Sequence, residues 1–128
     1  MRNGNGLRVL VVEDEVFISM LLEDMLMDLG CSKIDVAASV EKAIEYLADG
    51  APNFAILDIN LNGKKSFPVA DLLRRRDIPF VYISGYGEGG LESGHSGARI
   101  LQKPFRLDDL RRVVDDAVAD QKQVLGSH

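Results

Sequence analysis

The sequence predicts an α/β protein in which helices cover a parallel sheet. Short apolar runs alternate with amphipathic stretches along the whole chain, which is typical of a repeated strand–helix unit. Four of these apolar runs stop at a carboxylate, a hydroxyl or an ammonium group. Because the carboxyl ends of parallel strands meet at one edge of such a sheet, we expect these polar groups to form one site.

Five strands are expected, near 7–12, 33–37, 53–57, 79–83 and 98–102. The most clearly marked helix lies near 15–29, where apolar residues recur every three or four positions and Gly30 provides a stop. We expect this helix to turn one face to the core and to expose the opposite face, which carries Val16, Met20 and Met27. The residues expected to face the core are Ile18, Leu21, Leu22, Met25, Leu26 and Leu29.

Three further helices are expected. One opens at Ser39, ends at 49–50 and turns Ala43, Ile44 and Leu47 inward. Another covers 67–76, and the last covers 107–121 with acidic residues in its first turn. Between the fourth and fifth strands, the glycine-rich segment 85–97 disfavours a full helix, since each glycine costs a helix roughly 1 kcal/mol. We expect a short or mobile fourth helix there.

Length and composition describe one domain, 7–121, with flexible tails at 1–6 and 122–128. No apolar run approaches the roughly 20 residues of a membrane span, and the N-terminus lacks a signal-peptide pattern. The single Cys31 excludes an internal disulfide and favours a cytoplasmic location. A net charge of −5 argues against nucleic-acid binding.

The acids at the predicted strand ends have the chemistry of a magnesium site. Asp14 and Asp58 are the natural direct ligands, with Glu13 binding directly or through a metal-bound water. The backbone carbonyl of Asn60 could supply another oxygen. Crowded carboxylates repel one another, so a bound cation or Lys103 must offset their charge.

The same edge of the sheet suits phosphoryl transfer. Asp58 can act as the nucleophile, because a carboxylate needs no deprotonation to form an aspartyl phosphate. Magnesium, Lys103 and the Ser84 hydroxyl would each take one phosphoryl oxygen. Each of these residues alone could be an ordinary turn or cap residue, but four such signals in this order point to function.

These motifs resemble those of response-regulator receiver domains from bacterial two-component signalling. The resemblance rests on residues 11–15, 57–61, 83–85 and 103–105. It implies a flavodoxin-like (βα)5 three-layer sandwich with strand order 2-1-3-4-5. It also implies magnesium-dependent phosphorylation of Asp58 by a sensor histidine kinase or a histidine phosphotransfer protein, and a cis bond before Pro104. The expected output is altered binding to a downstream signalling protein, from a monomer or weak dimer without an output domain.

A narrower likeness lies in residues 79–87, which resemble the signature of the single-domain "FAT GUY" receivers. That group commonly has Thr at the position of Ser84, and the hydroxyl is kept. Most receivers carry an aromatic switch residue three positions before the lysine. This sequence departs from that pattern, because Ile100 occupies the position. Tyr86 is a candidate to replace it, and an apolar cover over the loop is an equally good interpretation of Tyr86.

Other functions fit the residues less well. A dehalogenase-like phosphatase needs a second Asp where Asn60 stands, and a flavodoxin needs a phosphate-binding loop where Glu13–Glu15 would repel phosphate. A phosphorylation-independent adaptor with the same fold stays open, although it would have no need for the complete set of polar residues. For the favoured receiver function we expect a signalling module that catalyses only its own phosphorylation and dephosphorylation.

Overall fold

The structure is a computed structural model, and it describes residues 6–85 and 99–126. A single parallel sheet of five strands has the order β2-β1-β3-β6-β7. This order is the predicted 2-1-3-4-5, because β6 and β7 are the fourth and fifth strands that the sequence predicted. The strands are β1 (Arg8–Val12), β2 (Lys33–Ala37), β3 (Phe54–Asp58), β6 (Phe80–Ser84) and β7 (Ile100–Gln102).

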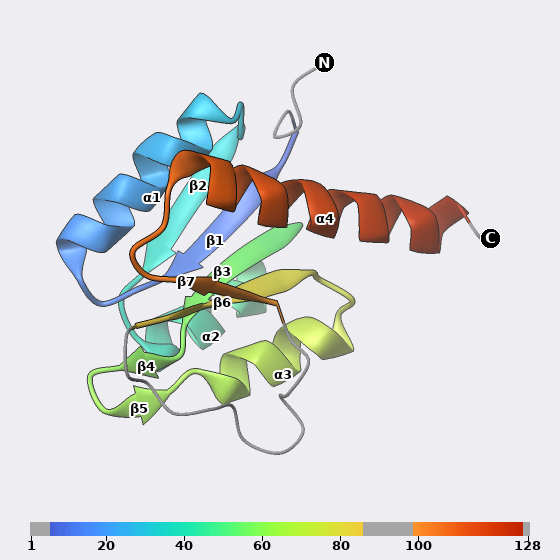
Figure 1. Cartoon of the computed structure of the whole chain (residues 1–128). Coiled ribbons are helices and arrows are strands. Elements are labelled where there is room, and N and C mark those ends of the chain that lie inside the picture. The colour runs from blue at the N-terminus through green and yellow to red at the C-terminus, as the bar shows by residue number, and fades with distance from the viewer. Residues whose placement is uncertain (1–5, 86–98, 127–128) are drawn as a thin grey trace.

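Helices form a layer on each face of the sheet (Figure 1). On one face lie α1 (Val16–Asp28) and α4 (Leu107–Gly126), and on the other lie α2 (Val40–Asp49) and α3 (Phe67–Arg75). The last helix runs past its predicted end at 121, so that 122–126, which we expected to be a tail, is helical. The result is the three-layer sandwich that the sequence predicted.

The central strand β3 is buried along its whole length, since helices cover both of its faces. Its side chains alternate between two separate apolar clusters, as the period of a strand requires. Ala55 and Leu57 belong to the cluster under α2 and α3, whereas Phe54 and Ile56 belong to the cluster under α1 and α4. The carboxylate of Asp58 stands where this buried strand ends.

The inward face of α1 differs from the predicted one at two positions. Leu22, Leu26 and Leu29 are buried as expected, but Leu21 is 42% exposed. Ser19 is buried instead, because its hydroxyl donates to the backbone oxygen of Val16 at 2.9 Å and needs no other partner. Apolar residues surround most of this helix, so their spacing alone did not fix its orientation.

Helix α2 begins as predicted, with the Ser39 hydroxyl accepting from the backbone N–H of Lys42. Ile44 is 39% exposed and not inward as expected, since the buried face of α2 centres on Ala43 and Leu47. At the other end, the guanidinium of Arg76 donates to two backbone oxygens, those of Leu47 and Gly50. This arginine therefore joins the end of α3 to the end of α2.

A small hairpin that the sequence analysis did not predict follows β3. Its strands are β4 (Asn60–Leu61) and β5 (Lys64–Lys65), which pair antiparallel. Between them Asn62 and Gly63 both have positive φ, 52° and 85°. An Asn-Gly pair with these angles is the preferred two-residue hairpin turn, so the signal for this hairpin was present in the sequence.

The glycine-rich segment 85–97, with Tyr86, lies almost entirely outside the described residues, so its short or mobile helix stays a prediction. Where the chain is described, no helix has the length and apolar character to cross a membrane.

Candidate functional site

The ends of β1 and β3 bring three carboxylates together. Glu13 and Asp14 follow β1 directly, and Asp58 is the last residue of β3. One oxygen from each of the three lies within 4.8 Å of the others. The backbone N–H of Glu13 donates to the oxygen of Ala37 at 3.0 Å, which fixes this turn to the neighbouring strand β2. The predicted acids thus form one cluster at the carboxyl edge of the sheet.

Lys103 enters this cluster from the loop after β7. Its ammonium lies 3.3 Å from the Oδ2 of Asp58 and 3.7 Å from the Oε1 of Glu13. The backbone N–H of Lys103 donates to the oxygen of Ser84 at 2.9 Å, and the bond to Pro104 is cis, as the resemblance implied. The lysine therefore reaches both buried carboxylates from a backbone that is itself held to β6.

Burial controls the charge of this cluster. Glu13 is only 1% exposed, and this burial raises its pKa from 4.5 to about 8, although a hydrogen bond from the backbone of Glu15 opposes the shift. The charge of Asp58 adds to the rise, and the charge of Lys103 works against it. Burial alone would lower the pKa of Lys103, but the two carboxylates outweigh burial and raise it. Without a further cation, burial therefore favours the protonated form of Glu13.

The residues of the cluster fit a magnesium ion. Magnesium prefers oxygen ligands and usually takes one or two carboxylates together with waters and phosphate oxygens. The Oε1 of Glu13 is buried and accepts no hydrogen bond from the described residues. Such an oxygen is costly to bury, and a metal ion bound to it would offset this cost more fully than the Lys103 ammonium does from 3.7 Å. The three carboxylates supply the donor atoms that the ion needs.

Asn60 and Ser84 border the same cluster. The backbone N–H of Asn60 donates to the Oδ1 of Asp58 at 3.1 Å, so the first residue of the hairpin is held to the carboxylate. Ser84 ends β6, whose residue Ile83 pairs with Asp58 in the sheet. All the residues predicted for the site thus lie on strand ends or loops at one edge. The roles of the Asn60 carbonyl and the Ser84 hydroxyl stay predictions.

Ile100, at the position of the missing aromatic switch, is 46% exposed on the edge strand β7. The replacement that the sequence suggested, Tyr86, lies outside the described residues.

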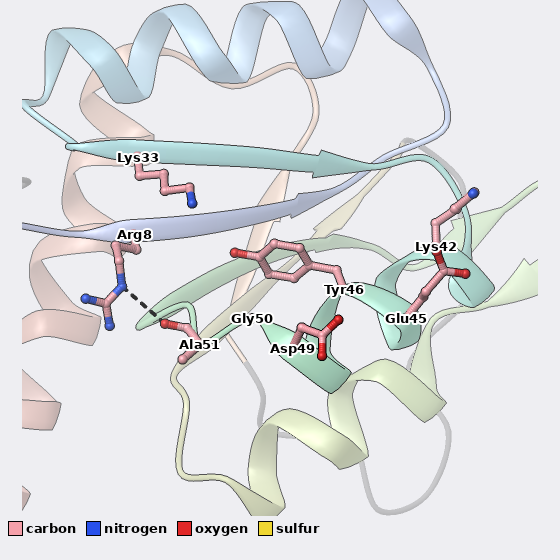
Figure 2. Close-up of a pocket in the computed structure, with 8 residues that line it drawn as sticks. All are labelled: Arg8, Lys33, Lys42, Glu45, Tyr46, Asp49, Gly50 and Ala51. Atoms are coloured by element: carbon pink, nitrogen blue, oxygen red, sulfur yellow. Dashed lines mark hydrogen bonds between the residues drawn. The ribbon is translucent and has the colours of Figure 1, made fainter.

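A shallow groove lies away from this cluster, between the starts of β1 and β2 and the end of α2 (Figure 2). In it the guanidinium of Arg8 donates to the backbone oxygen of Ala51 at 3.2 Å. Its cationic side chains, Arg8, Lys33 and Lys42, stand beside the acids Glu45 and Asp49. Because both signs of charge are present, the groove does not select a ligand of one charge.

Comparison with known proteins identifies the family. Residues 9–115 match the family model described as the response regulator receiver domain. The chain is a receiver domain. Members of this family are phosphoryl-accepting modules that interact with kinases and downstream signalling proteins, and they typically bind Mg²⁺. The prediction of the family from the strand-end motifs is therefore confirmed.

Individual relatives agree with this assignment. The solution structure of SdrG from Sphingomonas melonis Fr1 is 38% identical, has a TM-score of 0.80, and covers 93% of this chain and 99% of that one. The PhyR receiver domain of Erythrobacter litoralis is 31% identical with a TM-score of 0.78, covering 90% of this chain and 92% of that one.

Among the curated relatives, the phyllosphere-induced regulator PhyR of Methylorubrum extorquens is 30% identical over 118 residues, 89% of this chain and 44% of that protein. The curated relatives are longer proteins, and this receiver domain spans about half of their length or less, for example 52% in one and 26% in another.

Proposed function

We propose that this receiver domain accepts a phosphoryl group on Asp58 from the phosphohistidine of a sensor kinase or phosphotransfer protein. The observation that carries the proposal is the geometry of Asp58, which is 3% exposed and lies 3.3 Å from the Lys103 ammonium among two further carboxylates. A carboxylate with only a structural role would not need two further acids and a lysine around it. The phosphorylated domain would signal by a change in protein binding.

In this reaction a carboxylate oxygen of Asp58 attacks the phosphorus of the phosphohistidine. The new O–P bond forms as the P–N bond breaks, and the imidazole leaves with the electron pair and takes up a proton. Glu13, Asp14, Asp58 and the backbone carbonyl of Asn60 would hold Mg²⁺, which supplies positive charge for the phosphoryl oxygens.

Two side chains near Asp58 would bind the remaining phosphoryl oxygens. The Lys103 ammonium would bind a second phosphoryl oxygen and the Ser84 hydroxyl a third. Since Lys103 already contacts both Asp58 and Glu13, it must move from a carboxylate to the phosphoryl group when phosphate arrives. This movement would report phosphorylation to the loop after β7.

Helix α1 offers a surface on which the phosphodonor can dock. As predicted, Val16, Met20 and Met27 are exposed, by 66%, 55% and 64%. The sequence analysis overlooked Phe17, which is 86% exposed on the first turn, three residues after Asp14. Apolar side chains so open to water are typical of protein-binding surfaces, and flexible methionines suit such a role. The first turn of this helix, with Val16 and Phe17, follows Asp14 closely in the chain.

Intact mass measurement tests the proposal. The protein is incubated with acetyl phosphate, with and without Mg²⁺. We expect one phosphoryl group in the presence of magnesium and none on the Asp58→Asn variant. Asp14→Ala should weaken magnesium binding and slow phosphorylation together. A mass shift that persists in Asp58→Asn would assign the phosphate elsewhere, and a parent chain that takes up no phosphate would favour the adaptor function.

A further inference from the structure

The hairpin β4–β5 is a rigid arm attached to the phosphoacceptor. At its base the backbone N–H of Ser66 donates to the oxygen of Ile59 at 3.0 Å, which closes the loop. The side chain of Leu61 is 3% exposed and packs in the core beneath α2 and α3. Asn60, at the same base, is held through the bond from its backbone N–H to the Oδ1 of Asp58. The hairpin therefore has a fixed position relative to Asp58.

The exposed side chains of this arm are cationic. Lys64 and Lys65 form the whole of β5, and both are exposed. Lys64 makes an ion pair with Glu41 on α2, but both side chains are more than 60% exposed. A pair so open to water contributes about 0–1 kcal/mol, so another carboxylate can replace Glu41 at little cost. Among the described residues, Lys65 has no ionic partner.

The positive charges of Lys64 and Lys65 lie next to a negatively charged edge of the sheet. The protein carries a net charge of −5, and the edge of the sheet next to the hairpin holds Glu13, Asp14 and Asp58. Lys103 is largely covered and already engaged by two of these acids. An approaching acidic protein would be repelled by these acids and attracted by the two exposed cations of β5.

We propose that β4–β5 is an electrostatic docking arm for acidic side chains that flank the phosphohistidine of the donor protein. The inference rests on the proposed function, since it names a partner of the same site. Charges at the rim of an interface mainly raise the association rate, and they do so most at low salt. The arm would hold the acidic flank of the donor while the phosphohistidine reaches Asp58.

The test compares two variants of equal net charge. Lys64→Gln/Lys65→Gln removes the cations of the arm, and the control Lys33→Gln/Arg75→Gln removes two exposed cations from the start of β2 and the end of α3, at the opposite edge of the sheet. The donor is a purified sensor kinase labelled on histidine with radioactive ATP. It is chosen from the source organism as the one that transfers fastest to the parent chain. Acetyl phosphate serves as the small donor.

We expect the hairpin variant to lose about tenfold in kcat/KM for transfer from the kinase at low salt, with a weaker dependence on salt than the parent. The control variant should stay within about twofold of the parent, and acetyl phosphate should label all three proteins equally. Parent-like transfer by the hairpin variant would overturn the inference. An equal loss of kcat/KM in the control variant would also overturn it, as would an equal loss of the hairpin variant's labelling by acetyl phosphate. The inference would fail as well if acetyl phosphate labelled the parent but no kinase did. Failure of the proposed function is distinct, because the parent would then take up phosphate from neither donor.

Discussion

Replacing Glu13 by glutamine should change how the stability of this receiver domain depends on pH. In the folded protein without metal, Glu13 has a pKa of about 8, raised from 4.5 mainly by burial. Between these two values the folded state keeps a proton that the unfolded chain releases. The contribution of Glu13 to the free energy of unfolding is therefore complete below pH 4.5 and is lost as the pH rises toward 8.

The size of this loss follows from the rise of about 3.5 in pKa. At 1.36 kcal/mol for each pKa unit, it amounts to roughly 5 kcal/mol at most. Since small domains have about 5–15 kcal/mol of stability in total, the loss should be easy to measure. A glutamine side chain resembles the protonated acid and cannot titrate, so the Glu13→Gln variant should lack this decline. Lys103 does not disturb the comparison, because its pKa is raised above the ordinary lysine value and its ammonium stays charged throughout the assay.

Thermal unfolding in EDTA, followed by circular dichroism from pH 5 to 8, provides the assay. We expect the Tm of the parent to fall by roughly 10–20 °C over this range and that of Glu13→Gln to fall much less. Glu45→Gln, which removes an exposed acid on α2, is the matched control and should follow the parent. Magnesium should abolish the decline in the parent, because the ion favours the charged carboxylate. A Tm in EDTA that is constant or rises with pH, or an equal decline in Glu13→Gln, would refute the reasoning.

Three further changes probe separate parts of the domain. Lys103→Ala should leave the fold intact but slow phosphorylation by acetyl phosphate at least about tenfold, because one phosphoryl oxygen loses its cation; an unchanged rate would exclude that role. Met20→Lys or Met27→Glu should slow transfer from a labelled kinase but not from acetyl phosphate, and equal loss with both donors would indicate a damaged pocket. Arg76→Ala should lower the free energy of unfolding by about 1–3 kcal/mol in urea titrations, because two carbonyls at the end of α2 lose their donor, whereas the exposed neighbour Arg75→Ala should cost little.

The strands could be predicted because each is marked by a local run of apolar residues. Their order could be predicted because it follows from the resemblance to the family. A buried parallel strand such as Phe54–Asp58 is a continuous apolar run, and the polar residue that ends it marks the functional edge. The carboxylates and Lys103 were therefore found without coordinates. Their separations and the burial of Glu13 were not, because these depend on how five strands pack side by side.

The orientation of the helices and the hairpin β4–β5 show two different limits of predicting this structure from its sequence. Leu21 and Ile44 were placed inward because they extend an apolar stripe, but the stripe is wider than the surface that covers it. The hairpin was missed although the Asn62-Gly63 pair indicates a hairpin turn. Its strands have only two residues each, so they show no alternation of apolar and polar residues. Phe17 was assigned to neither face of α1, so its exposure of 86% was not predicted.

The division of the apolar interior into two clusters means that the two faces of this domain can change independently. The side chains under α1 and α4 and those under α2 and α3 are separated by the sheet, so enlarging a residue on one face does not crowd the other. Free energies of substitutions on opposite faces should be nearly additive, as for distant sites in general. The apolar layer under α1 and α4 can therefore be repacked while the layer under α2 and α3 keeps its contribution to the stability of the fold.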